Sequence, residues 1–562
     1  MTASERANGR DAIRDGRTAL GIEFGSTRIK ACLIDADDPT AVLAVGAHEW
    51  ENALVDGVWT YSLDAIWSGV RAAYAELIAD AERTHGVRPT TYGAIGVSAM
   101  MHGYLAFDAT GELLVPFRTW RNTSTGPAAA ELSALLGVNI PLRWSIAHLH
   151  QAVLDAEPHV AHLDHLTTLA GYVHERLTGR RVLGVGDASG MFPIDPATRD
   201  YDAELVARYG GLLERTAPVL APRLGLTALL PDVLVAGRPA GDLTAEGAAL
   251  LDPSGELKPG IPLCPPEGDA GTGMVATSAV APRTGNVSAG TSIFAMVVLD
   301  RPLARVHDEL DVVTTPSGDP VAMVHCNNGA SELAAWVGLF ERFAEVAGAA
   351  VDTDTAYDAL FREALASDSD AGGVLAYNQL AGEPIAGLDE GRPLVVRTPG
   401  SRFTLGSFMR AQLYGVFGTL ALGMHVLGDE GVALDRMFAH GGMFRTAGVA
   451  QRFLAGALDA PVSVAETASE GGAWGMAVLA AFREEAERGA TLDEYLRRHV
   501  FGGFAFETTT PDPDDVAGFA VFLDRYRAGL AIERTAVAAL PVTTAGSAGA
   551  HPDPSAPEGA SR

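Results

Sequence analysis

Cysteine and lysine are both scarce in this chain. Its 562 residues include three cysteines, Cys32, Cys264 and Cys326, which are too far apart for a CxxC pair or a zinc-binding pattern. This excludes a disulfide-stabilised fold and favours the reducing setting of the cytoplasm. Lysine occurs at Lys30 and Lys258 alone, so arginine supplies almost all of the positive charge.

The sequence also lacks an excess of positive charge and a long apolar run. Its 41 basic side chains face 70 acidic ones, a formal net charge of −29. Nucleic acids and anionic membranes bind through clustered Lys and Arg, so this balance argues against both as partners. We see neither an apolar run of about 18 residues nor, in residues 1–18, a secretory signal. We therefore expect a cytoplasmic protein with no transmembrane helix.

Short apolar, strand-like runs alternate with Ala- and Leu-rich helical stretches such as 63–85 and 471–488. This alternation is typical of α/β folds. Residues 1–17 are charged and predict no definite element. Residues 535–562 are rich in Ala, Pro, Gly and Ser, a composition that predicts a flexible tail.

Two segments of the chain resemble each other at an offset of 265 residues. FGSTRIKACLID (24–35) and AGTSIFAMVVLD (289–300) each contain a strand end, a turn of glycine and hydroxyl residues, and a longer apolar strand. Two short strands can look alike by chance, but this offset is close to half of the ordered chain, as a duplicated domain would give. We therefore predict two similar domains, 18–282 and 283–534, that face a ligand-binding cleft.

The turns of this repeat are candidate phosphate-binding sites. Glycine lets the backbone approach a phosphate closely, and successive N–H groups in a turn bind anions without basic side chains. One such turn alone is more often an ordinary hairpin, whereas a matched pair favours a clamp on a polyphosphate. The turn residues are Gly25, Ser26, Thr27, Gly290, Thr291 and Ser292.

Two further loops carry candidate functional residues. Gly441 and Gly442 follow a strand and precede a helix, but the segment lacks the GxGxxG and GxxxxGKS patterns, which disfavours Rossmann and P-loop folds. Asp269 lies in a Pro- and Gly-rich loop just before a helix-like run. Asp in this position often caps a helix, whereas Gly268 and Gly271 leave room for a ligand, so both interpretations stay open.

Polar and aromatic residues end two apolar strands in the first half of the chain. His102 follows one strand, and Trp120, Arg121 and Asn122 end another. In carbohydrate sites, aromatic rings pack against the sugar and polar groups bind its hydroxyls. These residues therefore suit such a site. Taken singly, His102 is equally well explained as a histidine of the core, and Trp120 as a tryptophan that packs against its neighbours.

In their order along the chain, these segments resemble the FGGY family of carbohydrate kinases, over about residues 20–506. GIEFGSTRIKACLID and GNVSAGTSIF resemble the two phosphate hairpins of that family. SAMMHG with TWRNT resembles its sugar-binding strands, PEGDAGTG the loop of its catalytic Asp, and AHGGMFRTAGVAQRFLAG its adenosine segment. The resemblance implies an α/β fold of two duplicated actin-like (ribonuclease H-like) domains that face a central cleft.

The resemblance also implies an activity and the residues that perform it. ATP would donate its γ-phosphate to a primary hydroxyl of a small sugar, with Asp269 as the general base and with Mg²⁺ held through water by Glu23 and Asp269. The nucleotide-binding residues that it implies are Gly25, Ser26, Thr27, Lys30, Gly290, Thr291, Ser292, Gly441 and Gly442. The substrate-binding residues that it implies are Met101, His102, Trp120, Asn122 and Asp269.

Three positions depart from the pattern of the family. Glu23 stands in place of the usual Asp, Asn122 in place of a carboxylate, and Met443 in place of a third glycine. We expect a ketopentose of the xylulose or ribulose type as the substrate. The alternatives are a polyol such as glycerol or erythritol, a catalytically weak sugar sensor, and a chaperone-type ATPase, which the sugar-side residues disfavour. The family further suggests a homodimer.

Overall fold

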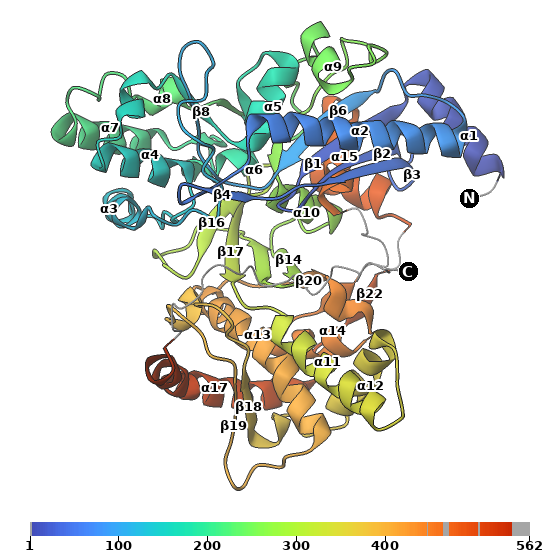
Figure 1. Cartoon of the computed structure of the whole chain (residues 1–562), viewed down its shortest axis with the longest axis vertical. Coiled ribbons are helices and arrows are strands. Elements are labelled where there is room, and N and C mark those ends of the chain that lie inside the picture. Colours follow the sequence, from blue (N-terminus) through green and yellow to red (C-terminus); the bar gives the residue numbers. More distant parts are fainter. Residues whose placement is uncertain (1–2, 447, 465–470, 504–505, 542–562) are drawn as a thin grey trace.

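The computed structural model describes residues 3–446, 448–464, 471–503 and 506–541, which form two lobes (Figure 1). The upper lobe in this view contains a five-stranded sheet with the order β13-β6-β1-β2-β3, and the lower lobe a seven-stranded sheet with the order β16-β17-β15-β14-β20-β21-β22. The upper strands are β1 (Thr18–Phe24), β2 (Arg28–Asp35), β3 (Val42–Glu49), β6 (Ala94–Ala99) and β13 (Glu267–Gly268). The lower strands are β14 (Thr284–Ala289), β15 (Ile293–Val298), β16 (Asp311–Thr314), β17 (Pro320–Cys326), β20 (Arg436–His440), β21 (Val462–Val464) and β22 (Glu507–Thr509).

The two sheets share one pattern of strands. In the upper sheet, β1 pairs antiparallel with β2 and parallel with β6, which pairs parallel with β13. In the lower sheet, β14 pairs antiparallel with β15 and parallel with β20, which pairs parallel with β21. The predicted repeat is therefore present as two equivalent hairpins, β1–β2 and β14–β15, and the duplicated α/β fold is confirmed.

Helices cover both sheets. Helix α2 (Leu63–His85) packs on β2 and β3; the Ser62 side chain accepts the Ala65 N–H at its start, and Gly86 ends it with a φ of 69°. The other long helices of the upper lobe are α1 (Ala3–Asp15), α3 (Gly126–Leu136), α4 (Ser145–Leu154), α5 (Leu169–Thr178), α7 (Ala203–Thr216) and α10 (Asp269–Ala276). Those that follow in the chain are α11 (Ser331–Val346), α12 (Thr353–Leu365), α13 (Leu405–Asp429), α14 (Val449–Leu458), α15 (Gly471–Glu487) and α17 (Pro513–Ala539).

Helix α15 crosses from the second half of the chain to the upper lobe, where it packs on β1, β6 and α10 (Figure 1). Gly21 of β1 permits this contact, because a Cβ there would lie 2.1 Å from the Ala473 carbonyl oxygen. The Trp474 indole N–H also donates to the Pro39 carbonyl at 2.9 Å. The lobe predicted as 18–282 therefore includes a helix from beyond that range.

Both ends of the described chain are more ordered than the composition indicated. Helix α1 buries Ala12 and Ile13, although residues 1–17 predicted no element. Helix α17 continues to Ala539, so a tail that begins at 535 is predicted too early. The tail prediction for residues 542–562 lies outside the described part of the chain.

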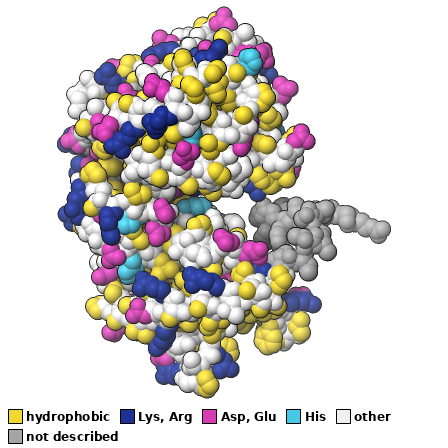
Figure 2. All heavy atoms as spheres, turned by 90° about the vertical axis from the view of Figure 1, so that its left-hand side faces the viewer, with side chains coloured by type: hydrophobic (Ala, Val, Ile, Leu, Met, Phe, Trp, Pro, Cys, Tyr) yellow, Lys and Arg dark blue, Asp and Glu magenta, His cyan; other side chains and the backbone are white. Residues whose placement is uncertain are grey.

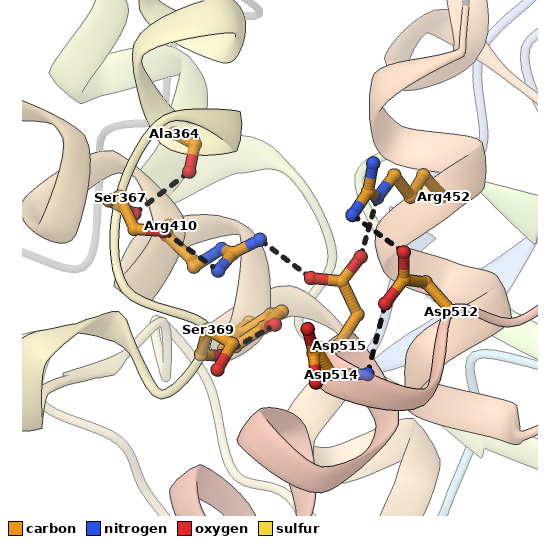
Figure 3. A network of polar contacts seen from close by, with 9 residues as sticks. Ala364, Ser367, Ser369, Arg410, Arg452, Asp512, Asp514 and Asp515 are labelled. Atoms are coloured by element: carbon orange, nitrogen blue, oxygen red, sulfur yellow. Dashed lines mark hydrogen bonds and ion pairs between the residues drawn. The ribbon is translucent and has the colours of Figure 1, made fainter.

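Helix α13 forms the centre of the lower lobe. By length and composition it is apolar enough to cross a membrane, contrary to the expectation that no such run exists, but 72% of its apolar window is buried inside the lobe. It carries the buried Arg410, whose guanidinium donates to the Asp515 carboxylate at 2.9 Å (Figure 3). Arg452 of α14 donates to the same carboxylate at 2.5 Å. This network joins three helices of the lobe, α13, α14 and α17.

The surface carries charges of both signs. On the face shown in Figure 2, Lys and Arg side chains lie among Asp and Glu side chains over both lobes, and the described residues form no broad basic patch there. On this face, therefore, the described residues do not concentrate positive charge in one place.

Candidate active site

The candidate site lies where three parallel strands of the upper sheet end together. Glu23 of β1 pairs with Ser98 of β6, which in turn pairs with Glu267 of β13. Asp269 follows β13 directly and begins α10. In α/β sheets, ligands bind at the carboxyl ends of parallel strands, so this edge is the expected place for chemistry.

Asp269 is held in a defined orientation at this edge. Its Oδ1 accepts the backbone N–H of Met101 at 3.1 Å. Burial raises the pKa of the Asp269 carboxyl above its usual range, and this hydrogen bond opposes part of the rise. A half-buried carboxylate of raised pKa is suited to accept a proton from a substrate.

Two fully buried carboxyl groups lie close to Asp269, and the sequence analysis missed both. Glu267 accepts the N–H groups of Gly186 at 3.4 Å and Asp187 at 3.1 Å. Burial, reinforced by the charge of Asp187, raises the pKa of Glu267 to about 8. Burial, reinforced by the charge of Asp269, raises the pKa of Asp187 to about 7.

Glycine makes room for the Glu267 side chain. A Cβ at Gly184 would lie 2.2 Å from Glu267 Oε1, and one at Gly186 would lie 2.3 Å from Oε2. The available signal was therefore the pair of glycines that precedes Asp187 in VLGVGDASG, because a backbone without Cβ atoms admits a carboxylate from another strand.

Three aromatic side chains hold the first hairpin turn. Trp50 donates its indole N–H to the Gly25 carbonyl at 2.7 Å, and the Tyr61 hydroxyl donates to the Ser26 carbonyl at 2.6 Å. These two rings stack with their centroids 4.0 Å apart. Trp120 donates its indole N–H to Ser26 Oγ at 3.3 Å. Trp120, predicted to bind the sugar, thus contacts the first turn that was predicted to bind phosphate.

The second hairpin turn is held by the loop that precedes α11. The N–H of Gly290 donates to the Ser292 carbonyl at 2.9 Å and closes the turn. Gly329 donates its N–H to the Thr291 carbonyl, and Ala330 donates to the Gly290 carbonyl, both at 2.8 Å. Gly290 and Thr291 are exposed at the tip of the hairpin, so their backbone is open to a ligand.

The predicted adenosine loop lies against the base of this hairpin. Gly441 has a φ of 120°, and a Cβ there would lie 2.1 Å from the Ala289 carbonyl oxygen. Only glycine fits this position, because both the conformation and the close approach exclude a side chain. Gly442 begins a short 3₁₀ helix and has open space around it.

The surroundings of Glu23 fit a hydrated cation. A Cβ at Gly472, at the start of α15, would lie 2.1 Å from Glu23 Oε1 and 3.1 Å from Thr272 Oγ1. Thr272 Oγ1 in turn donates to the Asp269 carbonyl at 3.1 Å, so Thr272 neighbours both acids.

The described residues contain no group of three or more His, Cys, Asp or Glu side chains that would ligate a metal directly. Two carboxylates that act through water are the set that suits Mg²⁺. Lys30 lies opposite Glu23 in the strand register.

On the sugar side, the predicted residues have different environments. His102 has a φ of 69°, is 4% exposed and stacks on Trp144 with the ring centroids 6.5 Å apart. Burial holds the pKa of His102 well below its usual value, so its imidazole is neutral. Its neighbour Met101 packs against Gly268, where a Cβ would lie 2.1 Å from Met101 Cγ.

Asn122, which the sequence predicted to contact the sugar, forms hydrogen bonds to the backbone. Its Oδ1 accepts the Trp59 N–H at 2.9 Å, and its Nδ2 donates to the carbonyls of Trp59 at 2.8 Å and Thr119 at 3.0 Å. The side chain is 8% exposed, and backbone groups occupy both ends of its amide. Asn122 therefore fixes the loop that carries Trp120, and its contact with the sugar stays a prediction.

Family models account for both lobes of the chain. The model of the N-terminal domain of the FGGY family of carbohydrate kinases matches residues 18–274, and the model of its C-terminal domain matches residues 285–484. The chain belongs to the FGGY family. Each model includes one of the two equivalent hairpins, β1–β2 or β14–β15, which agrees with the duplicated sheets of this FGGY protein.

Individual relatives are more distant. A xylulose kinase of Streptomyces coelicolor is 25% identical over 225 residues, which are 37% of this chain and 43% of the relative. The structure of a xylulose kinase from Rhodospirillum rubrum covers 92% of this chain and 99% of its own, with a TM-score of 0.71 and 23% identity. A gluconate kinase from Lactobacillus acidophilus covers 92% and 99%, with a TM-score of 0.72 and 16% identity. At these identities, the two structures establish the fold and leave the substrate open.

Proposed function

We propose that this protein transfers the γ-phosphoryl group of ATP to a primary hydroxyl of a small sugar. The observation that carries the proposal is Asp269, a carboxylate of raised pKa at the sheet edge from which the first phosphate hairpin projects. The second hairpin and the Gly441 loop come from the facing lobe, so nucleotide and sugar would meet between the lobes. Membership of the FGGY family supports the same reaction.

In this mechanism, Asp269 accepts the proton of the attacking hydroxyl, and the Met101 N–H keeps its carboxylate in place. The turn amides of the two hairpins bind the phosphates without basic side chains, as a chain with a formal net charge of −29 requires. Mg²⁺, when bound through water by Glu23 and Asp269, neutralises charge on the phosphates. Closure of the lobes excludes water and limits the hydrolysis of ATP.

For the substrate, we propose a ketopentose of the xylulose or ribulose type, in keeping with the xylulose kinases to which the chain is similar. A polyol such as glycerol or erythritol is the second candidate. The three cysteines are buried free thiols, which suits a reducing cytoplasm. A homodimer remains part of the proposal on the basis of the family alone.

The experiment is to measure ADP release by the purified protein with Mg-ATP and a panel of D-xylulose, L-xylulose, D-ribulose, L-ribulose, glycerol, erythritol and D-gluconate. We expect one neutral sugar or polyol to stimulate ADP release strongly, and Asp269→Asn to abolish that stimulation. Binding of a sugar without ADP release identifies a sensor instead. ADP release that no sugar changes contradicts the proposal and favours another kind of ATPase.

A further inference from the structure

The two faces of the lower sheet pack against different cores. Ala295 and Val297 of β15 face the core of the lower lobe, together with α13. The alternate residues Met296 and Val298 face the other way and belong to the core of the upper lobe, with Met274 of α10. One face of β15 and β17 is therefore the face that meets the upper lobe.

On this inter-lobe face, each row is a pair of residues that lie opposite each other in β15 and β17. These rows differ in burial along the strands. Met296 pairs with Met323, and both are buried. The next row toward the phosphate turn pairs Phe294 with His325, whose rings lie 6.4 Å apart, and both of these residues are only half-buried. The packing between the lobes thus ends at this row, which lies directly beside the turn that begins at Gly290.

Residues of the upper lobe surround the same place. Arg143 forms an ion pair with Asp311 of β16. Asp311 pairs with Met323 in the sheet register, so it lies on the inter-lobe face, one row from His325. The charge of Arg143 adds to burial in lowering the pKa of both His102 and His325, and the charge of His325 also acts on His102. The guanidinium of Arg143 therefore acts on both histidines, His102 of the upper lobe and His325 of the lower lobe.

We propose that His325 contacts the substrate from the lower lobe and binds a hydroxyl of a neutral polyhydroxy compound. The proposal rests on the proposed kinase function, because it places the sugar between Asp269 and the second phosphate hairpin. Within the described residues, the ring nitrogens of His325 have no hydrogen-bond partner. Its pKa is lowered to about 4, so the ring is neutral and offers one donor and one acceptor to a hydroxyl.

The charge balance at this place favours a neutral ligand over a sugar acid. Arg143 is the cation next to both histidines, and Asp311 already neutralises it. A neutral imidazole and a paired guanidinium provide no free positive charge for a carboxylate. We therefore expect ketoses or polyols to be substrates and aldonates such as D-gluconate to be poor ones.

The test compares two substitutions at His325 in the full-length protein. His325→Leu replaces the imidazole with an apolar side chain of similar bulk and so removes the hydrogen-bonding atoms. His325→Gln retains a donor and an acceptor. His162→Ala, a substitution at an exposed histidine, is the control. For each protein we would measure the KM of the sugar that the wild type phosphorylates best, the KM of ATP, kcat, and the sugar Kd by calorimetry.

We expect His325→Leu to raise the sugar KM and Kd about tenfold or more, the effect of losing one hydrogen bond to a bound hydroxyl. The KM of ATP and the melting temperature should stay unchanged, and His325→Gln should recover part of the sugar affinity. A sugar affinity that is equal in the wild type and His325→Leu overturns the proposal. So does a parallel rise in both KM values with a lower melting temperature, because it makes His325 a packing residue.

Failure of the proposed function gives a different result. If the wild type binds a sugar but releases no ADP, the kinase proposal fails, while calorimetry on His325→Leu still decides the role of His325. If D-gluconate is the best substrate, the kinase function stands and the preference for a neutral ligand is overturned. If the wild type binds none of the panel, both proposals fall together.

Discussion

At the scale of residues, three carboxyl groups near one another have unlike surroundings. Glu267 and Asp187 are fully buried and accept hydrogen bonds from the protein, whereas Asp269 is half-buried beside the sheet edge. Burial raises the pKa of all three groups, to about 8 for Glu267 and about 7 for Asp187, so these two retain protons near neutral pH that isolated carboxylates would release. Asp269 is the member of the group that a substrate is able to reach.

The role of Asp269 as general base is tested by Asp269→Asn. The amide keeps the shape of the side chain but accepts no proton, so kcat should fall at least about a hundredfold. Binding of Mg-ATP, measured by calorimetry, should stay near normal, because the phosphate turns are intact. A wild-type kcat at saturating sugar would rule out this role.

Glu23 gives a second prediction at the same scale. Replacing Glu23 with Gln removes the negative charge but not the length of the side chain. We expect a higher Mg²⁺ concentration for half-maximal activity, with little change in the sugar KM, because the Glu23 side chain lies against Gly472 at the start of α15 and none of the predicted sugar-side residues contacts it there. Glu23→Asp, which restores the charge, is the matched variant and should need less Mg²⁺ than Glu23→Gln. Identical magnesium titrations for wild type and Glu23→Gln would count against a metal role.

At the scale of elements, buried ion pairs join the helices of the lower lobe. Arg410 and Asp515 are 2% and 3% exposed in their side chains, and Arg410 also lies 4.7 Å from the centre of the Phe453 ring. Such pairs add specificity more than net stability, but removing one partner leaves a buried charge without compensation.

Asp515→Ala should therefore lower the free energy of unfolding of the lower lobe by about 3–5 kcal/mol, measured by urea denaturation. Asp512 provides the matched control, since it binds the same Arg452 at 3.1 Å but is 40% exposed. Asp512→Ala also removes the side-chain cap of α17, so we expect a loss of about 1–2 kcal/mol there. If both variants lose the same free energy of unfolding, the buried ion pair with Arg410 contributes no more to stability than the exposed contact of Asp512.

At the scale of the whole molecule, a continuous core and several hydrogen bonds connect the lobes. Residues of β15 and β17 belong to the same apolar cluster as α10 and α15. The Thr314 hydroxyl of β16 donates to the Val185 carbonyl at 3.0 Å, and the Thr314 N–H donates to Ser189 Oγ at 3.1 Å. The lobes are thus joined both by apolar packing and by hydrogen bonds between their backbones and side chains.

The stability of the whole chain depends on pH, and Glu383 contributes to this dependence. This residue is fully buried, accepts two N–H groups of Asn328 with Oε2, and has its pKa raised by burial from 4.5 to about 7. The folded protein thus keeps a proton that the unfolded chain releases. This contribution to stability is complete below pH 4.5 and is lost as the pH rises through about 7.

We therefore expect the wild type to lose up to about 3 kcal/mol of stability between pH 5 and pH 8 relative to Glu383→Gln, which does not titrate at this position. Thermal unfolding of both proteins across this range measures the difference. A difference in melting temperature between the two proteins that does not change with pH would show that Glu383 keeps the same protonation in the folded and unfolded states.

Much of the architecture followed from the sequence alone. The repeated turns at Gly25 and Gly290 predicted two equivalent hairpins, because a turn and its flanking strands are local features that neighbouring residues determine. The alternation of apolar runs predicted the α/β class for the same reason. The order of the short motifs was enough to identify the family that both domain models confirm.

Only the tertiary structure decided which residues from distant segments meet. Glu267 enters a space left by Gly184 and Gly186, and the register of β15 and β17 places His325 beside Phe294. The sequence predicted a sugar contact for Asn122, and only the structure shows that its amide binds the backbone of Trp59 and Thr119. Burial, charge proximity and the engagement of an amide depend on long-range packing, and no local pattern of residue types contains that information.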